Sequence, residues 1–195
     1  MGDQPPREKW NERYAQGRFG AGAEAADWLV ENRGLLDVAA GGRALDVACG
    51  TGRNAVYLAR LGYAVDAFDV SDVAIDALRA TADAQGLDID GRVVDLEAQP
   101  LPTDAYDLVV NLNYLQRDLF GPLVAALRPG GLLVFETVSR AHVEEFGHSF
   151  PSQFVLERNE LLHAFGALYV RHYREGVLDR AGAPRGVAGL VAQRV

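Results

Sequence analysis

The segment from residue 44 to residue 54, ALDVACGTGRN, constrains the fold of this chain more than any other part. It begins as a short apolar run that is typical of a buried strand, and it ends in residues that can start a helix. Gly50 and Gly52 lie in the turn between them, where a backbone without Cβ atoms can be approached closely. The outward-pointing amides of a helix start bind polar groups. Such a turn is typical of a nucleotide-like cofactor site at the carboxyl edge of a parallel sheet.

Strand and helix patterns alternate along the rest of the chain. We expect strands at 44–48, 63–68, 92–94, 106–112, 132–138, 168–173 and 187–193. Helices are expected at 53–61, 71–85, 115–127 and 157–165, with a loop at 139–153. The last two strands should form an antiparallel hairpin, because the link between them is too short to hold a crossover helix easily. The expected fold class is α/β, with a doubly wound, Rossmann-like, seven-stranded and mostly parallel sheet that carries an antiparallel terminal strand.

The domain organisation follows from length and from the two ends of the pattern. A chain of 195 residues suits one domain over 1–195 with a substantial core. Residues 1–9 are polar and contain proline, so we expect them to be flexible. Residues 10–32 should form a helical lid segment, with a helix at 23–32.

Composition limits the classes of partner. Lys and Arg total 19 against 27 Asp and Glu, and the net charge of −8 argues against nucleic acid or an anionic membrane surface. A single cysteine excludes an intramolecular disulfide, and no metal site is suggested. The N-terminus has no apolar core like that of a signal peptide, and no apolar run is long enough to cross a bilayer. We therefore expect a cytoplasmic monomer or homodimer.

Three aspartates at predicted strand ends indicate the kind of cofactor. Asp46, Asp69 and Asp95 follow neighbouring strands, so they should meet at one edge of the sheet. A nicotinamide-binding turn usually carries a third glycine, which does not follow Gly52 at the right spacing. A carboxylate at Asp46 would face a pyrophosphate unfavourably but would suit the cationic groups of S-adenosylmethionine. Asp69 can accept both ribose hydroxyls of either cofactor, so it does not discriminate.

The sequence LDVACGTG at 45–52 resembles the first motif of the class I S-adenosylmethionine-dependent methyltransferases. VDAFDVS at 65–71 is similar to their second motif, and LRPGGLL at 127–133 is similar to the segment before their fifth strand. GRNAVYLA at 52–59 and VVDL at 93–96 resemble the tellurite-resistance group most closely, with the thiopurine-type enzymes near it. This chain has Ala48 where the family usually has glycine.

The resemblance implies a set of cofactor-binding residues. Asp46, Ala48, Gly50 and Gly52 would line the methionine portion of S-adenosylmethionine. Asp69 and Val70 would hold the ribose, Asp95 and Leu96 would frame the adenine, and Asn111 would lie under the reacting end. Asp179 stands where the tellurite-resistance group carries histidine, whereas Arg180 matches the arginine that follows.

The expected reaction is methyl transfer to a small-molecule acceptor. A soft acceptor, such as a thiol or a metalloid, needs little help from a general base, and no catalytic dyad is evident. The candidates for the acceptor side are His148, Arg180 and Tyr14. Cys49 is expected to be a small buried residue rather than a nucleophile. The open alternatives are a protein or RNA methyltransferase, a non-catalytic S-adenosylmethionine-binding protein and, more remotely, a nicotinamide-dependent reductase.

Overall fold

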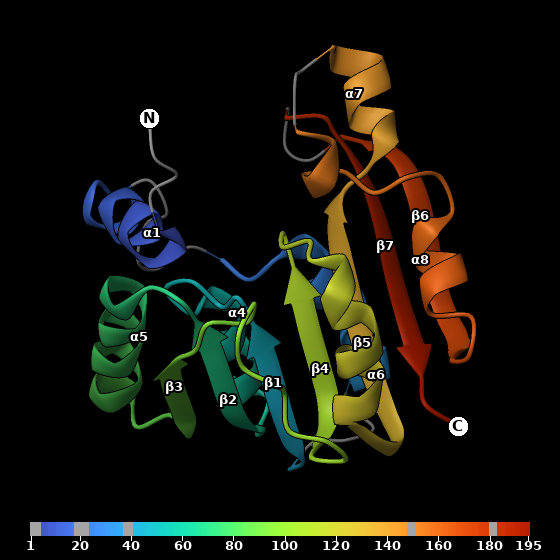
Figure 1. Cartoon of the computed structure of the whole chain (residues 1–195). Coiled ribbons are helices and arrows are strands. Elements are labelled where there is room, and N and C mark those ends of the chain that lie inside the picture. The colour runs from blue at the N-terminus through green and yellow to red at the C-terminus, as the bar shows by residue number, and fades with distance from the viewer. Residues whose placement is uncertain (1–4, 18–23, 37–40, 148–150, 180–182) are drawn as a thin grey trace. The chain divides into compact units, whose positions relative to one another are not determined.

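The computed structural model describes residues 5–17, 24–36, 41–147, 151–179 and 183–195. The chain divides into two units, Met1–Leu101 and Pro102–Val195, each with its own strands and helices. Figure 1 labels these elements along the chain.

Three parallel strands form the sheet of the first unit, in the order β3-β2-β1. They are β1 (Arg43–Val47), β2 (Ala64–Asp69) and β3 (Ile89–Val93). Nearly every residue of β1 and β2 is buried, as expected for parallel strands that are covered on both faces. β3 is more exposed because it lies at the edge of this sheet.

Two longer helices connect these strands. α4 (Arg53–Arg60) lies between β1 and β2 in the sequence, and α5 (Asp72–Gln85) lies between β2 and β3. The Ser71 hydroxyl caps α5 by accepting a hydrogen bond from the Ala74 amide (3.2 Å), and Gly86 ends the helix in the left-handed conformation. Before β1 the chain forms α1 (Pro6–Ala15), α2 (Asp27–Glu31) and α3 (Arg33–Leu36). α1 packs against α5 (Figure 1).

The second unit contains four strands in the order β4-β5-β7-β6. They are β4 (Tyr106–Leu112), β5 (Leu127–Val138), β6 (Tyr169–Leu178) and β7 (Arg185–Gln193). β4 and β5 are parallel, whereas β7 is antiparallel to both of its neighbours. The predicted C-terminal hairpin is therefore confirmed. The remaining elements are η2 (Arg117–Leu119), α6 (Phe120–Ala126), α7 (Arg140–Phe146), η3 (Ser152–Phe154) and α8 (Glu160–Ala164).

An aromatic cluster and a buried ion pair hold the second unit together. Phe120 and Phe135 pack with Phe165, and the ring centroids lie 5.2 to 5.9 Å apart. Elsewhere in this unit, Arg174 Nη2 lies 2.8 Å from Glu136 Oε2, and the Glu136 side chain is only 4% exposed. Gly189 pairs with both charged residues in the strand register, so no side chain stands between them.

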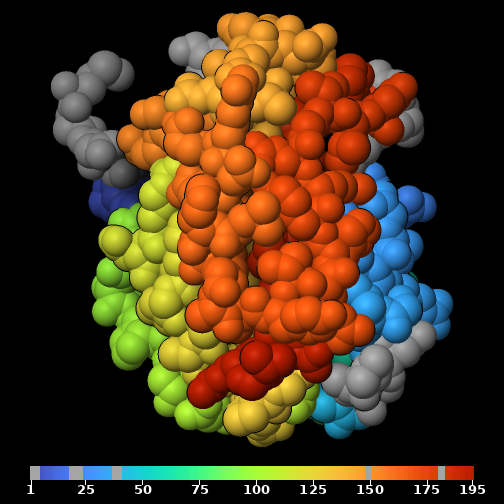
Figure 2. Space-filling model, turned by 90° about the vertical axis from the view of Figure 1, so that its right-hand side faces the viewer, coloured from blue at the N-terminus to red at the C-terminus, as the bar shows by residue number. Residues whose placement is uncertain are grey.

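The predicted fold class is confirmed: the chain is α/β, with seven described strands that are mostly parallel and an antiparallel strand at the C-terminal end. The outermost strand of the second unit, β6, exposes large apolar side chains, among them Tyr169 and Val177. Figure 2 shows part of this surface in orange. Among the residues that the structure describes, none of the helices combines the length and apolar character needed to cross a membrane.

One expectation for local structure was wrong: the expected loop at 139–153 includes α7. α1 begins at Pro6, within the region 1–9, and the flexibility of that region stays a prediction. Neither helix buries a single residue, so neither carries the apolar periodicity that predicts a helix. Pro6 at the first turn was the available signal for α1.

Several expected helices are shorter in the structure. The helix expected at 23–32 begins only at Asp27 in α2. The helix expected at 115–127 consists of η2 and α6, which together span residues 117–126. The helix expected at 157–165 is shortened to α8. These differences concern the ends of the elements and leave their order unchanged.

Replacement of Gly52 by alanine should destabilise the first unit strongly. Gly52 has φ +83°, and a Cβ atom there would lie 2.1 Å from Leu78 Cδ1. We expect Gly52→Ala to lower the free energy of unfolding by about 2–4 kcal/mol, as measured by urea denaturation, because left-handed strain and overpacking add. Gly86→Ala is the matched control, since Gly86 has φ +62° with nothing within 4 Å. It should cost only about 1 kcal/mol; equal losses would contradict the steric argument.

Candidate functional site

The turn after β1 has a backbone that few side chains tolerate. Ala48, Gly50 and Gly52 all have positive φ angles, of 53°, 56° and 83°. The Cys49 amide donates to the carbonyl of Phe68 (3.0 Å), which attaches the turn to the end of β2. The left-handed conformation of Ala48 explains why glycine suits this position better.

Asp46 is a buried carboxylate at the carboxyl end of β1. Its exposed fraction is 1%, and among the residues that the structure describes its Oδ2 atom has no hydrogen-bond partner. Burial raises the pKa of Asp46 to about 7, although a backbone hydrogen bond from Ala55 and the charge of Arg53 oppose the shift. A buried acceptor of this kind suits a cationic ligand group.

Asp69 lies at the equivalent end of β2, next to β1 in the sheet. Its Oδ2 accepts a hydrogen bond from the Gly50 amide (2.8 Å), and its Oδ1 accepts one from the Ser71 amide (2.9 Å). Burial raises the pKa of Asp69, while these amides oppose the shift. The carboxylate therefore joins the turn after β1 to the start of α5.

The residues expected at the adenine lie beside this carboxylate. The Val94 amide donates to the Asp69 carbonyl (2.8 Å), which brings the segment after β3 to the end of β2. Asp95 is exposed, and its Oδ1 accepts from the Glu97 amide (3.0 Å), whereas Leu96 is buried. Val70 is partly exposed. The structure thus gathers Asp46, Ala48, Gly50, Gly52, Asp69, Val70, Asp95 and Leu96 at one edge of the sheet of the first unit. We call these eight residues the donor cluster, after the methyl donor that the sequence predicts at this edge.

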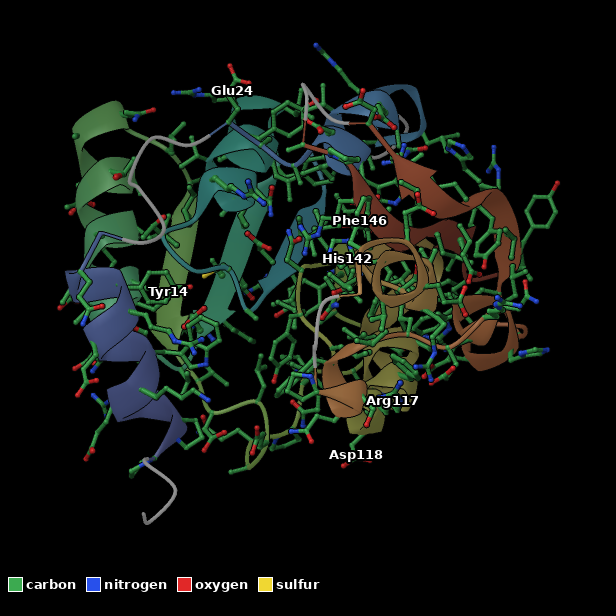
Figure 3. The ribbon with its side chains drawn as sticks, turned by 90° about the horizontal axis from the view of Figure 1, so that it is seen from above. Tyr14, Glu24, Arg117, Asp118, His142 and Phe146 are labelled. Atoms are coloured by element: carbon green, nitrogen blue, oxygen red, sulfur yellow. The ribbon has the colours of Figure 1, made fainter. Side chains whose placement is uncertain are left out.

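Tyr14 belongs to the same edge. It projects from α1 towards the strand ends of the first unit (Figure 3). A Cβ atom on Gly50 would lie only 2.7 Å from the Tyr14 hydroxyl oxygen, so the two residues are in close contact. Burial and the charge of Asp69 raise the pKa of Tyr14 well above its usual value. Tyr14 is therefore protonated at neutral pH and can act as a hydrogen-bond donor.

Cys49 behaves as predicted. Its side chain is buried, and burial raises the pKa of its thiol well above the usual value. The neighbouring carboxylates Asp46 and Asp69 reinforce the shift. A protonated, buried thiol is a poor nucleophile.

In the second unit, Asn111 ends β4 in a buried position. Its exposed fraction is 1%, and its Nδ2 donates to the carbonyl of Tyr114 (2.8 Å). Its place beneath the reacting end of a cofactor stays a prediction. His148 and Arg180 fall outside the described residues, so their roles on the acceptor side also stay predictions.

In the second unit, His142 and Arg117 both have hydrogen-bond partners within the protein. His142 Nδ1 accepts a hydrogen bond from the Gly186 amide (3.2 Å), and its ring lies 5.0 Å from that of Phe146 (Figure 3). Arg117 donates to both carboxylate oxygens of Glu160, at 2.7 and 3.0 Å, so it has a structural partner. A neutral His142 must then carry its proton on Nε2, which makes it a donor rather than a base.

A separate pocket of about 610 Å³ lies in the first unit. Its floor is one face of α4, with Val56 and Tyr57 between Arg53 and Arg60. The acidic residues of its wall are Glu24, Asp27 and Glu31. None of the donor cluster lines this pocket. Among the described residues, no group of three or more His, Cys, Asp or Glu side chains is arranged to hold a metal.

The sequence reasoning missed two asparagines that fix the segments before β1. Asn54 is 5% exposed, and its Oδ1 accepts from the Ala26 amide (3.0 Å). Asn11 contacts Ser71 and Asp72 at the start of α5. The position of Asn54 directly after the glycine-rich turn and Arg53 was the available signal, whereas nothing in the local pattern distinguished Asn11.

Comparisons with known proteins identify the family and the fold of this chain. The family model of the tellurite resistance protein TehB matches residues 29–182. A ubiquinone biosynthesis O-methyltransferase of Brucella anthropi is 34% identical over 103 residues, which span 50% of this chain and 42% of that protein. The matched part of the chain therefore spans less than half the length of this relative.

Solved structures share the fold over most of the chain. TehB from Haemophilus influenzae has a TM-score of 0.70 at 20% identity, covering 95% of this chain and 67% of that one. An S-adenosylmethionine-dependent methyltransferase from Mesorhizobium loti has a TM-score of 0.69 at 20% identity, covering 87% of this chain and 99% of that one. The expected fold and family are confirmed, and the chain belongs to the family of the tellurite resistance protein TehB.

Proposed function

We propose that this chain transfers a methyl group from S-adenosylmethionine to a small-molecule acceptor. Asp46 carries the proposal: a carboxylate with an exposed fraction of 1% has an oxygen with no hydrogen-bond partner in the described part of the chain. A buried acceptor without a partner is costly, and a cationic ligand would satisfy it. Membership of the TehB family supports the same conclusion.

The donor cluster fits this cofactor residue by residue. Asp46 would face its cationic methionine end, and the turn at Gly50 and Gly52 would lie against the same methionine portion. Asp69 would accept the ribose hydroxyls, because a carboxylate oxygen that already binds one amide has a second lone pair. Asp95 and Leu96 would frame the adenine. When bound, S-adenosylmethionine supplies a methyl group activated by a sulfonium.

Two titratable side chains at the edge that carries the donor cluster favour an acceptor with an available lone pair. Tyr14 and Cys49 both stay protonated at neutral pH, so neither can remove a proton. A thiol or a metalloid needs little proton removal before attack, whereas an amine or a hydroxyl does. We infer that the acceptor is a soft nucleophile, and that the chain mainly aligns it and excludes water.

Calorimetric titration with S-adenosylmethionine, S-adenosylhomocysteine and NADH tests the cofactor. Wild-type chain should bind the first two and not NADH. Asp69→Ala should weaken binding at least tenfold, about 1.4 kcal/mol, because the ribose loses its acceptor. Asp83→Ala is the matched control, since Asp83 is exposed on α5. Binding of NADH alone would overturn the proposal, and an unchanged affinity for Asp69→Ala would show that the site is misplaced.

The pKa of Asp46 predicts how binding varies with pH. The ionised carboxylate binds the cation, and its pKa is raised to about 7 in the free chain. Affinity for S-adenosylmethionine should fall below pH 7, by up to about tenfold per pH unit. Asp46→Asn cannot titrate, so the ratio of wild-type to variant affinity between pH 5.5 and 8.5 cancels the titration of the ligand itself. A ratio that is constant over this range would contradict the role of Asp46.

The same substitution should stabilise the ligand-free chain. Because the folded state holds the Asp46 proton more tightly than the unfolded state, stability is lost as pH rises through the window from about 4 to about 7. At pH 8, Asp46→Asn should raise the free energy of unfolding by at least about 1 kcal/mol, or about 3 °C in Tm. The gain should disappear at pH 4, and thermal denaturation at the two pH values measures it.

A further inference from the structure

Helix α1 is held in place without any buried residue. None of its ten residues is fully buried, although Tyr14 is partly buried. Polar contacts with the start of α5 help to hold it. Arg7 Nη2 lies 3.0 Å from Asp72 Oδ2, Asn11 Nδ2 donates to Asp72 Oδ1, and the Ser71 hydroxyl donates to Asn11 Oδ1 (2.7 Å).

These contacts reach the two sides of the Asp69 carboxylate. Asn11 binds Ser71, whose amide donates to Asp69 Oδ1. Tyr14 lies against Gly50, whose amide donates to Asp69 Oδ2. Asn11 and Tyr14 are three residues apart and therefore share one face of α1. One helix face thus touches both of the backbone positions that hold this carboxylate.

The attachment is suited to opening and closing. The ion pair between Arg7 and Asp72 is exposed, with side-chain exposures of 56% and 41%, and exposed pairs contribute little stability. Asp72 has its pKa lowered to about 2 by Arg7 and Asn11, so it stays ionised at ordinary pH. Elements with few buried apolar contacts open at low cost in free energy.

We propose that Asn11 and Asp72 are positioning residues that fasten α1 over the donor cluster and hold Tyr14 against Gly50. Closure of α1 is then coupled to the ribose-binding carboxylate, because the helix and the ligand share Ser71, Asp69 and Gly50. This inference rests on the proposed function, since it assigns a role toward the same cofactor. It predicts that the contacts of α1 slow the departure of the ligand.

An exchange of the amide and the carboxylate tests this role. Asn11→Asp places a second carboxylate against Asp72 and should break the attachment. Combining it with Asp72→Asn restores one acceptor and one amide donor in reversed order, and Arg7 keeps a carboxylate within reach one helical turn away. Gln16→Ala is the control, because it removes an exposed amide at the end of the same helix.

Two measurements on the full chain distinguish a positioning role from a structural one. The first is the dissociation rate of S-adenosylhomocysteine, followed by rapid mixing. The second is hydrogen exchange of the α1 amides with and without that ligand. Asn11→Asp should release the ligand about tenfold faster and weaken protection of α1 by a similar factor. Its Tm should stay within about 2 °C of wild type, since no residue of α1 is fully buried. The double variant should recover both rates, and Gln16→Ala should match wild type.

The contrary outcomes are distinct. If Asn11→Asp releases the ligand at the wild-type rate, or if the double variant is no better than the single one, the positioning role is wrong. If Asp69→Ala abolishes binding at the same time, the proposed function stands and only this inference fails. If wild-type chain binds no S-adenosylhomocysteine, both fail together.

Discussion

The rest of the donor cluster depends on the hydrogen bonds that the Asp69 carboxylate accepts. By accepting from the amides of Gly50 and Ser71, it joins a glycine turn that follows one strand to a helix that follows the next. Hydrogen bonds to a buried carboxylate are stronger than those between neutral groups, so the two backbone segments are held at a fixed distance. Ser71 then caps α5 and binds Asn11, which extends the same connection to α1.

Burial of Asp46 illustrates a compromise between stability and binding. An unpartnered oxygen on a buried carboxylate destabilises the free chain, and the raised pKa records this cost. The same oxygen gives a cationic ligand a site where water does not compete. Strained or unsatisfied groups of this kind are expected where a protein binds its ligand rather than where it only folds.

In the second unit, two glycines of β7 permit close contacts between neighbouring elements that the strand pattern does not predict. Gly189 leaves room for Arg174 to reach Glu136 across the strand between them. At Gly186, a Cβ atom would lie 2.0 Å from the His142 amide nitrogen, so only glycine lets α7 pack against the start of β7. The same contact fixes the ring of His142 through its Nδ1 atom. These contacts explain how α7, with no buried residue, is held in place.

The sequence by itself determined the succession of strands along the chain, the glycine turn, the cap at Ser71 and the placement of Asp46 and Asp69 at neighbouring strand ends. Each of these depends on local chemistry: apolar runs for buried strands, glycine for positive φ, and a hydroxyl at a helix start. Only the tertiary structure decided that α7 is a helix, that α1 begins at Pro6, that Tyr14 lies against Gly50 and that Asn11 binds Ser71 and Asp72. Periodicity reports burial, and no residue of these helices is fully buried, so the sequence pattern does not give their positions, which depend on contacts between residues that lie far apart in the sequence.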